Sequence, residues 1–182
     1  MNKLFKVDKA VHSLLYSLQQ LGGATDMHKL CKILYFADQR HLSMYGRSIT
    51  GDTYIAMQYG PVPSNVDDIF KALRGDSFFA SSVEIEPIKK TMAFENRFII
   101  RALQSPDMDE LSASDVECLQ YALDLCRDKS FAELTDYSHG LAWNNTKRDR
   151  EMSVKDILRE AGEDEAYIGY IADKQRMQEA FL

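Results

Sequence analysis

The sequence predicts a mostly helical α+β fold, in which a helical domain carries a small antiparallel β-sheet or hairpin packed on a central helix. Apolar residues recur at three- and four-residue steps near both ends of the chain, whereas residues 50–104 contain short alternating segments and turn signals. The 182 residues, 45% of them apolar and 27% charged, are typical of one folded domain. We expect that domain to span residues 1–182.

The first 46 residues predict two helices. An apolar stripe predicts the first, over about residues 8–21, and Gly22 and Gly23 are expected to stop it. The stripe comprises Val11, Leu14, Leu15, Leu18 and Leu21. Thr25 and Asp26 offer an N-cap for a second helix, which is expected to run to about Tyr45 and to end at Gly46.

The second helix is apolar on most of its sides. Its stripe of Leu30, Ile33, Leu34 and Ala37 is widened by Cys31, Tyr35 and Phe36, so that only Lys29, Lys32, Gln39 and Arg40 are expected to face water. A helix of this kind is usually covered by several neighbours. We therefore expect it to be the central spine of the domain.

The segment after the second helix predicts a strand and a short helix. Residues 50–52 are a turn signal, and residues 53–59 alternate with the period of a strand. The prolines at positions 61 and 63 are expected to end that strand, because proline cannot donate to a ladder. Residues 64–67 match a capping box and predict a helix through Leu73, stopped by Gly75.

The rest of the chain predicts two more strands followed by helices. Residues 83–88 and 95–103 are expected to form strands around a turn near 89–92, in one sheet with the strand at 53–59. Ser114 with Glu117, Ser130 with Glu133 and Ser153 with Asp156 match capping signals. They predict helices near 114–128, 130–138 and 153–161, with a last helix from about residue 163.

Charge and cysteine usage exclude several classes of protein. The 22 Lys and Arg against 28 Asp and Glu give a formal charge of −6, which argues against nucleic acid as the partner. The basic stretch at residues 147–150 is read as a solvated face. No apolar run approaches the length of a membrane span, and the first residues lack the apolar core of a signal peptide. We expect a cytoplasmic protein that makes no use of a membrane, and the three unpaired cysteines fit a reducing compartment.

A search for catalytic or metal-binding patterns finds little. His28 and Cys31 lie three residues apart on one helix, but no further ligand matches them by spacing. No phosphate-binding glycine loop is present. His41 projects from the apolar face of the spine; it is read either as a core histidine bonded to a carbonyl or tyrosine, or as one wall of a pocket with Tyr45 and Asp38. We expect no metal, no cofactor and no enzymatic activity.

Two aromatic-rich segments make the sequence recognisable. The first begins at Lys29-Leu30-Cys31-Lys32-Ile33-Leu34-Tyr35-Phe36-Ala37-Asp38, continues through Tyr45-Gly46-Arg47-Ser48-Ile49-Thr50-Gly51-Asp52 and ends in Gly60-Pro61-Val62-Pro63-Ser64. The second is Ser138-His139-Gly140-Leu141-Ala142-Trp143. Together they resemble the SocA-like Panacea domain, a family of bacterial and phage antitoxins. Ser48 stands where the family pattern has proline.

The resemblance implies a helix-rich fold with a small β element and no known catalytic residues. It also implies that the protein neutralises a cognate protein toxin by direct contact. One branch of the family is thought to deliver its toxin to a protease, so a proteolytic adaptor or a phage-encoded regulator is the alternative, with an enzyme that uses a pocket near His41 the less favoured one. The toxin, the surface that meets it and the oligomeric state are not predicted.

Two groups of residues are candidates for function. The expected partner-binding residues are Tyr35, Phe36, Tyr54, Tyr59, Pro61 and Pro63, because aromatic side chains are favoured at the centre of interfaces. The alternative for these aromatic residues is a place in the core. The motif residues expected to support the structure are Asp38, His41, Tyr45, Arg47, Asp52, His139 and Trp143. We expect Asp38, Arg47 and Asp52 to form a polar network at the helix-to-strand corner, and Trp143 to be a buried plug that packs the C-terminal helices onto the spine.

Overall fold

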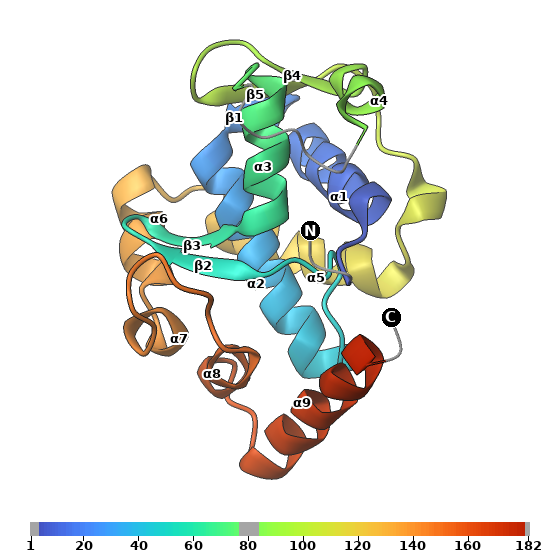
Figure 1. Ribbon diagram of the computed structural model, residues 1–182. Coiled ribbons are helices and arrows are strands. Elements are labelled where there is room, and N and C mark those ends of the chain that lie inside the picture. The colour runs from blue at the N-terminus through green and yellow to red at the C-terminus, as the bar shows by residue number, and fades with distance from the viewer. Residues whose placement is uncertain (1–3, 77–83, 181–182) are drawn as a thin grey trace.

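Helix α2 (Met27–Tyr45) lies at the centre of the protein, and the other elements surround it (Figure 1). The computed structural model describes residues 4–76 and 84–180. Every residue from position 30 to position 38 is buried, so this stretch of α2 is covered on all sides. The expectation that this helix is the spine is confirmed, because a helix buried all round must have neighbours on every face.

Capping interactions define the ends of α2. The side chain of Asp26 accepts a hydrogen bond from the backbone N–H of Lys29 at 2.8 Å, as an N-cap does. At the other end Gly46 adopts a left-handed conformation with φ of 65°, and its N–H donates to the carbonyl of Leu42. The preceding helix, α1 (Val7–Gln20), also matches its prediction and buries Val11, Leu14, Leu15 and Leu18.

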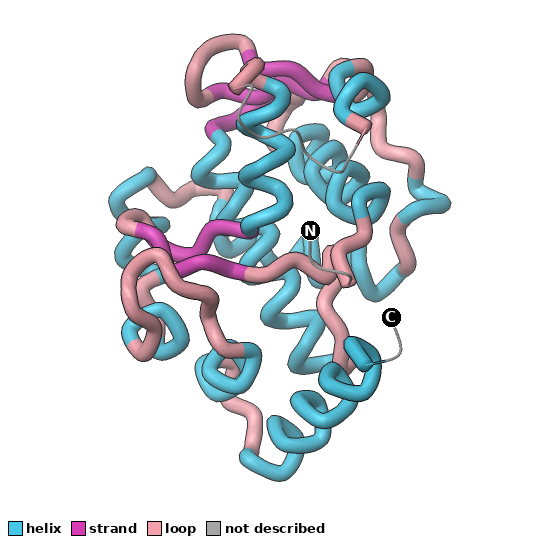
Figure 2. Tube along the Cα trace, in the orientation of Figure 1, coloured by secondary structure: helices cyan, strands magenta, loops and turns pink. Residues whose placement is uncertain are grey.

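The strands form two separate antiparallel sheets (Figure 2). One has the order β1-β5-β4 and consists of β1 (Ala24–Asp26), β5 (Ile99–Ala102) and β4 (Met92–Phe94). The other is a hairpin of β2 (Tyr54–Met57) and β3 (Gly60–Pro63), joined by Gln58 and Tyr59. A mostly helical fold with small antiparallel sheets is therefore confirmed.

The prediction for the second β region is wrong in two respects. Residues 85–89 form a short helix, α4 (Ile85–Lys89), and the predicted strand start at Val83 lies outside the described residues. The strands that follow, β4 and β5, join β1 and not the strand near Thr53. We missed β1 because a three-residue strand that also supplies the N-cap of α2 carries no readable alternation.

We expected the segment Gly60-Pro61-Val62-Pro63 only to end the preceding strand, but it forms a strand of its own, β3. Ala56 lies opposite Pro61 and Tyr54 opposite Pro63, whereas the backbone N–H of Ser64 donates to Thr53 at 2.9 Å. Hydrogen-bonded and non-hydrogen-bonded pairs alternate in an antiparallel ladder. Both prolines fall on the non-hydrogen-bonded pairs, where a missing N–H costs the hairpin nothing.

Two helix starts differ from the capping boxes that we predicted. Ser64 does not cap α3 (Ser64–Leu73); Asp52, from the preceding loop, accepts hydrogen bonds from the N–H groups of Asn65 and Val66 at 3.0 Å each. Helix α5 (Ala113–Cys126) is capped by the reciprocal pair Ser112 and Asp115, not by Ser114 and Glu117. A sequence motif shows which side chains can cap, whereas the fold decides which of them is near.

The C-terminal part is helical, as predicted, and packs against α2 and the hairpin. Helix α6 (Phe131–Ser138) has the expected Ser130–Glu133 capping box, and α8 (Val154–Glu160) and α9 (Glu165–Ala180) follow. The 3₁₀ turn η1 (Met108–Glu110) and the short helix α7 (Leu141–Asn144) were not predicted. Within the part of the chain that the structure describes, no helix has the length and hydrophobicity that crossing a bilayer requires.

Candidate partner-binding site

Asp38 holds the corner between α2 and β2. Its side chain is 1% exposed and accepts four hydrogen bonds: from the N–H groups of Ile49 (2.7 Å) and Thr50 (3.2 Å), and from the hydroxyls of Thr50 (2.6 Å) and Tyr54 (2.8 Å). Burial raises the pKa of Asp38, and these hydrogen bonds oppose the rise. The carboxylate therefore fixes the path of the loop that leads from α2 into the hairpin.

Asp52 extends this arrangement toward α3. Its backbone N–H donates to the Thr50 hydroxyl at 3.1 Å, and its carboxylate accepts from the side-chain amide of Asn65 at 2.7 Å in addition to the two cap bonds. Burial raises the pKa of Asp52, and the bonds from Asn65 and Val66 oppose it. Thr50 thus links Asp38 and Asp52 in one network, which confirms the prediction for these two residues.

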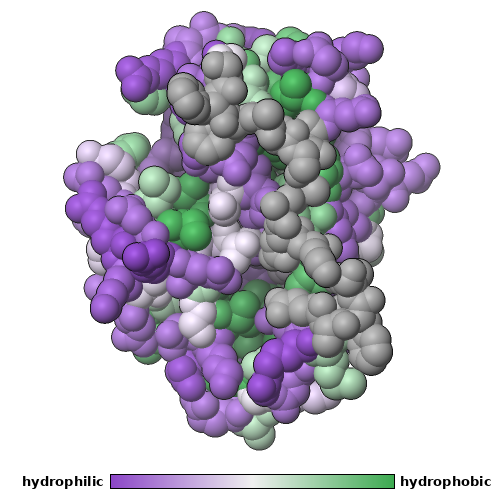
Figure 3. Space-filling model, in the orientation of Figure 1, coloured by the Kyte–Doolittle hydropathy of each residue, from purple (hydrophilic) through white to green (hydrophobic). Residues whose placement is uncertain are grey.

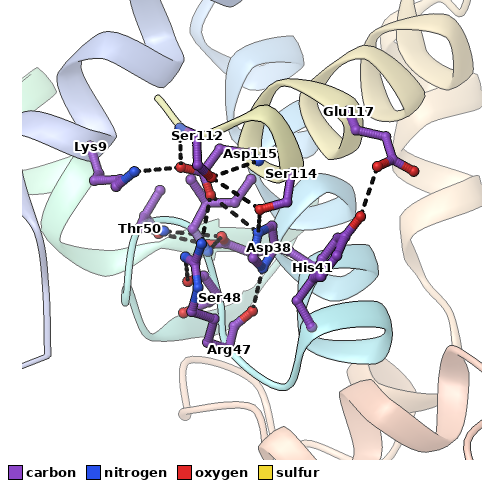
Figure 4. Close-up of polar contacts among 12 residues, drawn as sticks. Lys9, Asp38, His41, Arg47, Ser48, Thr50, Ser112, Ser114, Asp115 and Glu117 are labelled. Carbon is purple, nitrogen blue, oxygen red and sulfur yellow. Dashed lines mark hydrogen bonds and ion pairs between the residues drawn. The ribbon is translucent and has the colours of Figure 1, made fainter. Parts of the chain in front are cut away.

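Arg47, which we expected in the same network, belongs instead to a neighbouring cluster centred on Asp115 of α5 (Figure 4). The buried carboxylate of Asp115 lies 3.3 Å from an Arg47 nitrogen and 3.1 Å from His41 Nε2, and it also contacts Lys9 Nζ. Burial alone would raise the pKa of Asp115, but hydrogen bonds from His41, Lys9 and Ser112 outweigh it and hold the pKa well below its usual range. This cluster ties α1, α2 and α5 together.

The geometry around His41 is that of a core histidine. Its Nδ1 lies 2.7 Å from the carbonyl oxygen of Arg47, while its Nε2 lies 3.1 Å from both the Ser114 hydroxyl and the Asp115 carboxylate. In a Ser-His-Asp triad the serine and the acid face opposite ring nitrogens; here they share one. His41 is 0% exposed, and the hydroxyl of Tyr45 donates instead to Glu117 at 2.7 Å.

Burial removes five of the six expected partner-binding residues from the surface. Tyr35 is 0% exposed and donates from its hydroxyl to Glu160 at 2.9 Å. The others that are buried are Phe36, Tyr54, Pro61 and Pro63. These residue types are common at interfaces, but here they lie on the spine and on the inner side of the hairpin, where they form part of the core. Tyr59 alone, at the hairpin turn, is exposed, with 51% of its surface open.

An exposed aromatic cluster surrounds the hairpin turn. The ring of Tyr59 meets the ring of Phe131, at the start of α6, with 5.3 Å between centroids, and Phe131 is also 51% exposed. His28 lies 4.1 Å behind Phe131, and its Nε2 is 3.1 Å from the carbonyl oxygen of Tyr59. Figure 3 shows a mainly hydrophilic face with apolar residues gathered in small patches, one of them over the hairpin. Phe131 was not among the expected partner-binding residues, because in the sequence it stands alone beside a capping signal.

Lys32 is buried beneath this hairpin, which corrects the expectation that it faces water. The side chain is 0% exposed, and its Nζ donates to the carbonyl oxygen of Pro61 at 2.9 Å. Burial lowers the pKa of Lys32 to about 8. A side chain at Gly60 would lie 2.8 Å from this Nζ and would collide with Ser138, so the motif glycine gives the lysine room to reach β3.

Trp143 packs against the hairpin and not as a buried plug on the spine. Its ring is half-buried and stacks on His139 at 3.7 Å, and its Nε1 donates to the carbonyl oxygen of Met57 at 2.9 Å. Ala142, its neighbour, is the fully buried residue of α7. The prediction of a buried tryptophan is therefore wrong, and the second motif holds the outer end of β2.

Two cavities lie elsewhere on the surface. The larger, about 930 Å³, lies between α9 and the loop that joins α2 to β2, and it is lined by residues that include Arg47, Asp52, Tyr170 and Lys174. The smaller, about 270 Å³, lies between α2, α5, α6 and α8 and is lined by residues that include Arg40, Tyr121, Tyr137 and Glu160. Neither is lined by Asp38, His41 or Tyr45.

The described residues contain no group of three side chains placed to hold a metal ion. Cys31 is buried, and burial raises the pKa of its thiol to about 12, so it is not an activated nucleophile. The basic stretch at 147–150 is exposed, and Arg148 donates to Gln58 at 2.7 Å. The arrangement as a whole is suited to binding: a rigid hairpin presents aromatic side chains at its turn.

A protein-family model matches residues 30–144, and the family is described as the SocA-like antitoxin, Panacea domain. The matched segment runs from α2 to the end of α7 and covers more than half of the chain. It contains the hairpin, the Trp143 motif and both polar clusters except Lys9. No curated protein and no solved structure gives a significant match.

Proposed function

The chain belongs to the SocA-like Panacea antitoxin family, and from this premise we propose that it neutralises a protein toxin by direct, stoichiometric binding. The hairpin turn with Tyr59, together with Phe131 of α6, anchors the toxin. The observation that supports this site is the pair of contacting aromatic rings, each 51% exposed, at the end of a braced hairpin. Exposed aromatic residues in contact are a frequent centre of binding energy at interfaces.

The hairpin is held in place before any partner arrives. Lys32 donates a hydrogen bond to β3 from the inside, and Trp143 donates one to the end of β2. The segment after α7 pairs with the outer edge of β2, where the N–H of Ala56 donates to the carbonyl oxygen of Arg150 at 2.9 Å. A surface that is already ordered loses little conformational entropy on binding. Such a surface can bind tightly with few contacts.

Binding and not catalysis is the mode that the polar clusters favour. Asp38, His41 and Asp115 form hydrogen bonds with neighbouring backbone and side-chain groups. None of the three lines either cavity. Groups committed in this way stabilise the fold and have no access to a substrate. An antitoxin of this kind is consumed in an equimolar complex.

The test is a titration of the purified toxin, taken as the product of the reading frame adjacent to the gene, with the purified antitoxin. We expect toxin activity to end near an equimolar ratio. Tyr59→Ala combined with Phe131→Ala should weaken binding at least about tenfold, as the loss of interface anchors does. Tyr170→Ala is the matched control, because Tyr170 is an exposed tyrosine (63%) on α9 and should bind as wild type does.

The titration also separates the rival functions. One antitoxin molecule that inactivates many toxin molecules without a protease would contradict the proposal and indicate an enzyme. Neutralisation that occurs in cells but requires a protease in the purified system would indicate a proteolytic adaptor. Equal losses in the Tyr170 variant and in the double variant would place the contact elsewhere.

A further inference from the structure

Arg40 is a cation without an anion. It projects from α2, and the centre of its guanidinium group lies 4.1 Å from the centroid of the Tyr121 ring on α5. Within the described residues it forms no ion pair and no hydrogen bond, and its Nε is buried without an acceptor. Five other arginines each pair with a carboxylate: Arg47, Arg74, Arg101, Arg159 and Arg176.

Arg40 lines the cavity of about 270 Å³ between α2, α5, α6 and α8. Phe36, Tyr121 and Tyr137 provide aromatic walls, and the Phe36 and Tyr137 rings meet edge to face at 5.3 Å. Tyr121 and Tyr137 are 43% and 50% exposed, so the aromatic walls reach the protein surface. The cavity is smaller than a typical small-molecule pocket of about 300–1,000 Å³ and has the size for one inserted side chain.

The other charged group of the cavity is already satisfied. The carboxylate of Glu160 accepts hydrogen bonds from the Tyr35 hydroxyl and the Gln39 amide at 2.9 Å each, and from the backbone N–H of Ala142 at 2.8 Å. Gly140 leaves the space that this carboxylate occupies. The unmet requirement of the cavity is therefore a hydrogen-bond acceptor for Arg40, on the side of Tyr121.

We propose that this cavity, which we call the Arg40 pocket, receives an aspartate or glutamate side chain of the protein partner. A carboxylate is the natural complement of a guanidinium group, because two parallel N–H···O bonds join them. The stacking of Arg40 on Tyr121 holds the guanidinium group in place, so little rotamer entropy is lost when the acid enters. Glu160 repels a carboxylate at its own end of the pocket, which restricts entry to the Tyr121 side.

This inference rests on the proposed function, since the acid belongs to the toxin. It adds a second anchor of different chemistry to the Tyr59–Phe131 pair. An aromatic contact contributes area, whereas a charge pair in a half-open pocket contributes specificity, because a partner without the acid leaves Arg40 unpaired. A toxin that is recognised in this way must present an exposed acidic side chain next to its apolar contact.

The test compares toxin binding by the wild-type protein, Arg40→Gln and Arg97→Gln. We expect Arg40→Gln to weaken binding at least about tenfold, since it removes one partner of a charge pair that the bound toxin would cover. Arg97 is the matched control: it also lies over an aromatic ring, Phe98 at 5.8 Å, and forms no ion pair among the described residues, but it lies at the turn between β4 and β5. Arg97→Gln should bind as wild type does.

Two further measurements distinguish lost recognition of an acidic side chain from a damaged fold and from a general effect of salt. The melting temperature of Arg40→Gln should not fall by more than a few degrees, because no hydrogen bond is lost; a large fall would mean that Arg40 supports the fold and would overturn the proposal. Sodium acetate at 100 mM, compared with sodium chloride at the same concentration, probes the site with a free carboxylate: if acetate alone displaces the toxin from the wild-type protein, the toxin and a carboxylate compete for one site, whereas equal displacement by the two salts would overturn the proposal.

The outcomes separate this inference from the function on which it rests. Toxin that binds wild type and Arg40→Gln equally would overturn the Arg40 pocket and leave the proposed function intact. Toxin that fails to bind the wild-type protein would overturn both. In the supporting case, the ¹⁵Nε resonance of Arg40, identified by its loss in Arg40→Lys, shifts when toxin is added, whereas the resonance of Arg97 does not.

Discussion

The amino group of Lys32 donates a hydrogen bond to the carbonyl oxygen of Pro61 at 2.9 Å, and both residues are buried. This contact joins the spine to the hairpin that carries Tyr59. A buried ammonium group with a single acceptor is costly, because desolvation disfavours its charged form. The positive charge of Lys32 therefore opposes folding, whereas its long side chain connects α2 to β3.

The first prediction concerns the pH dependence that follows from Lys32. Burial lowers its pKa to about 8, below the unfolded value of about 10.5, so the unfolded chain binds more protons between these values. Stability should rise with pH across this window, by at most about 3 kcal/mol. Urea unfolding at pH 7.5 and pH 10 measures the rise, and Lys32→Met, which cannot titrate, supplies the reference. Equal pH slopes for the two proteins would contradict the assignment.

The second prediction concerns Asp38. An asparagine at this position keeps the shape of the side chain but places an amide group against donors that need an acceptor. We expect Asp38→Asn to lower the free energy of unfolding by about 2–4 kcal/mol. Tyr54→Phe removes one of the four hydrogen bonds and should cost about 1 kcal/mol. Denaturant unfolding measures both, and a loss in Asp38→Asn no larger than that in Tyr54→Phe would mean that the other three bonds contribute little.

The periodicity of the sequence was sufficient for the long helices but not for the strands or for the short helices α4 and α7. The stripes of α1 and α2 extend over fourteen and nineteen residues, so their period is readable, and Asp26 and Gly46 mark the ends of α2. The strands are three or four residues long and carry almost no period. Which of them pair depends on contacts between distant segments, such as Thr25 with Ile100, that no local pattern contains.

The candidate site was harder to predict for the same reason. Asp38, Arg47 and Asp52 were expected to form one network, because charged residues beside a buried helix need partners; Asp38 and Asp52 do, whereas Arg47 contacts Asp115. Tyr35 and Tyr59 have the same side chain, but one lies in the core and the other on the surface. Residue type predicts interface propensity, whereas exposure is a property of the whole fold. Arg40 could not be singled out, since a missing counter-ion is visible only in three dimensions.

The third prediction separates the partners of Asp115. Arg47 is one of three side chains, with Lys9 and His41, that contact this carboxylate, and it is 39% exposed, so Arg47→Ala should lower the free energy of unfolding by only about 0.5–1 kcal/mol. Asp115→Asn leaves Lys9, His41 and Arg47 facing a neutral group and should cost about 2–4 kcal/mol at pH 7. Thermal unfolding distinguishes the two, and an Arg47→Ala protein that keeps its stability but loses toxin binding would make Arg47 an interface residue.

Asp115 also predicts a direction for acid unfolding. Its folded pKa lies below the unfolded value of about 3.9, so the stability that it contributes is present above that value and is lost as the pH falls toward the folded pKa. The difference in stability between wild type and Asp115→Asn should therefore shrink from pH 5 to pH 2. A difference that grows with acidity would contradict the lowered pKa.

The fourth prediction uses Trp143, the only tryptophan of the chain, as a reporter of the hairpin. The ring is half-buried, so its emission should lie between those of a buried and a free indole, and Trp143→Ala should cost about 1–3 kcal/mol, less than the loss of a fully buried ring.

Burial and the charge of Lys32 lower the pKa of His139, which is therefore neutral at pH 7 while it stacks on the indole at 3.7 Å. A protonated imidazole quenches indole fluorescence, so the emission should fall as the pH drops, with a midpoint below the usual histidine value of about 6.5. His139→Gln should abolish this midpoint without moving the emission maximum. A midpoint at or above 6.5, or one that persists in His139→Gln, would show that the stack does not form in solution and that the outer end of β2 is held in another way.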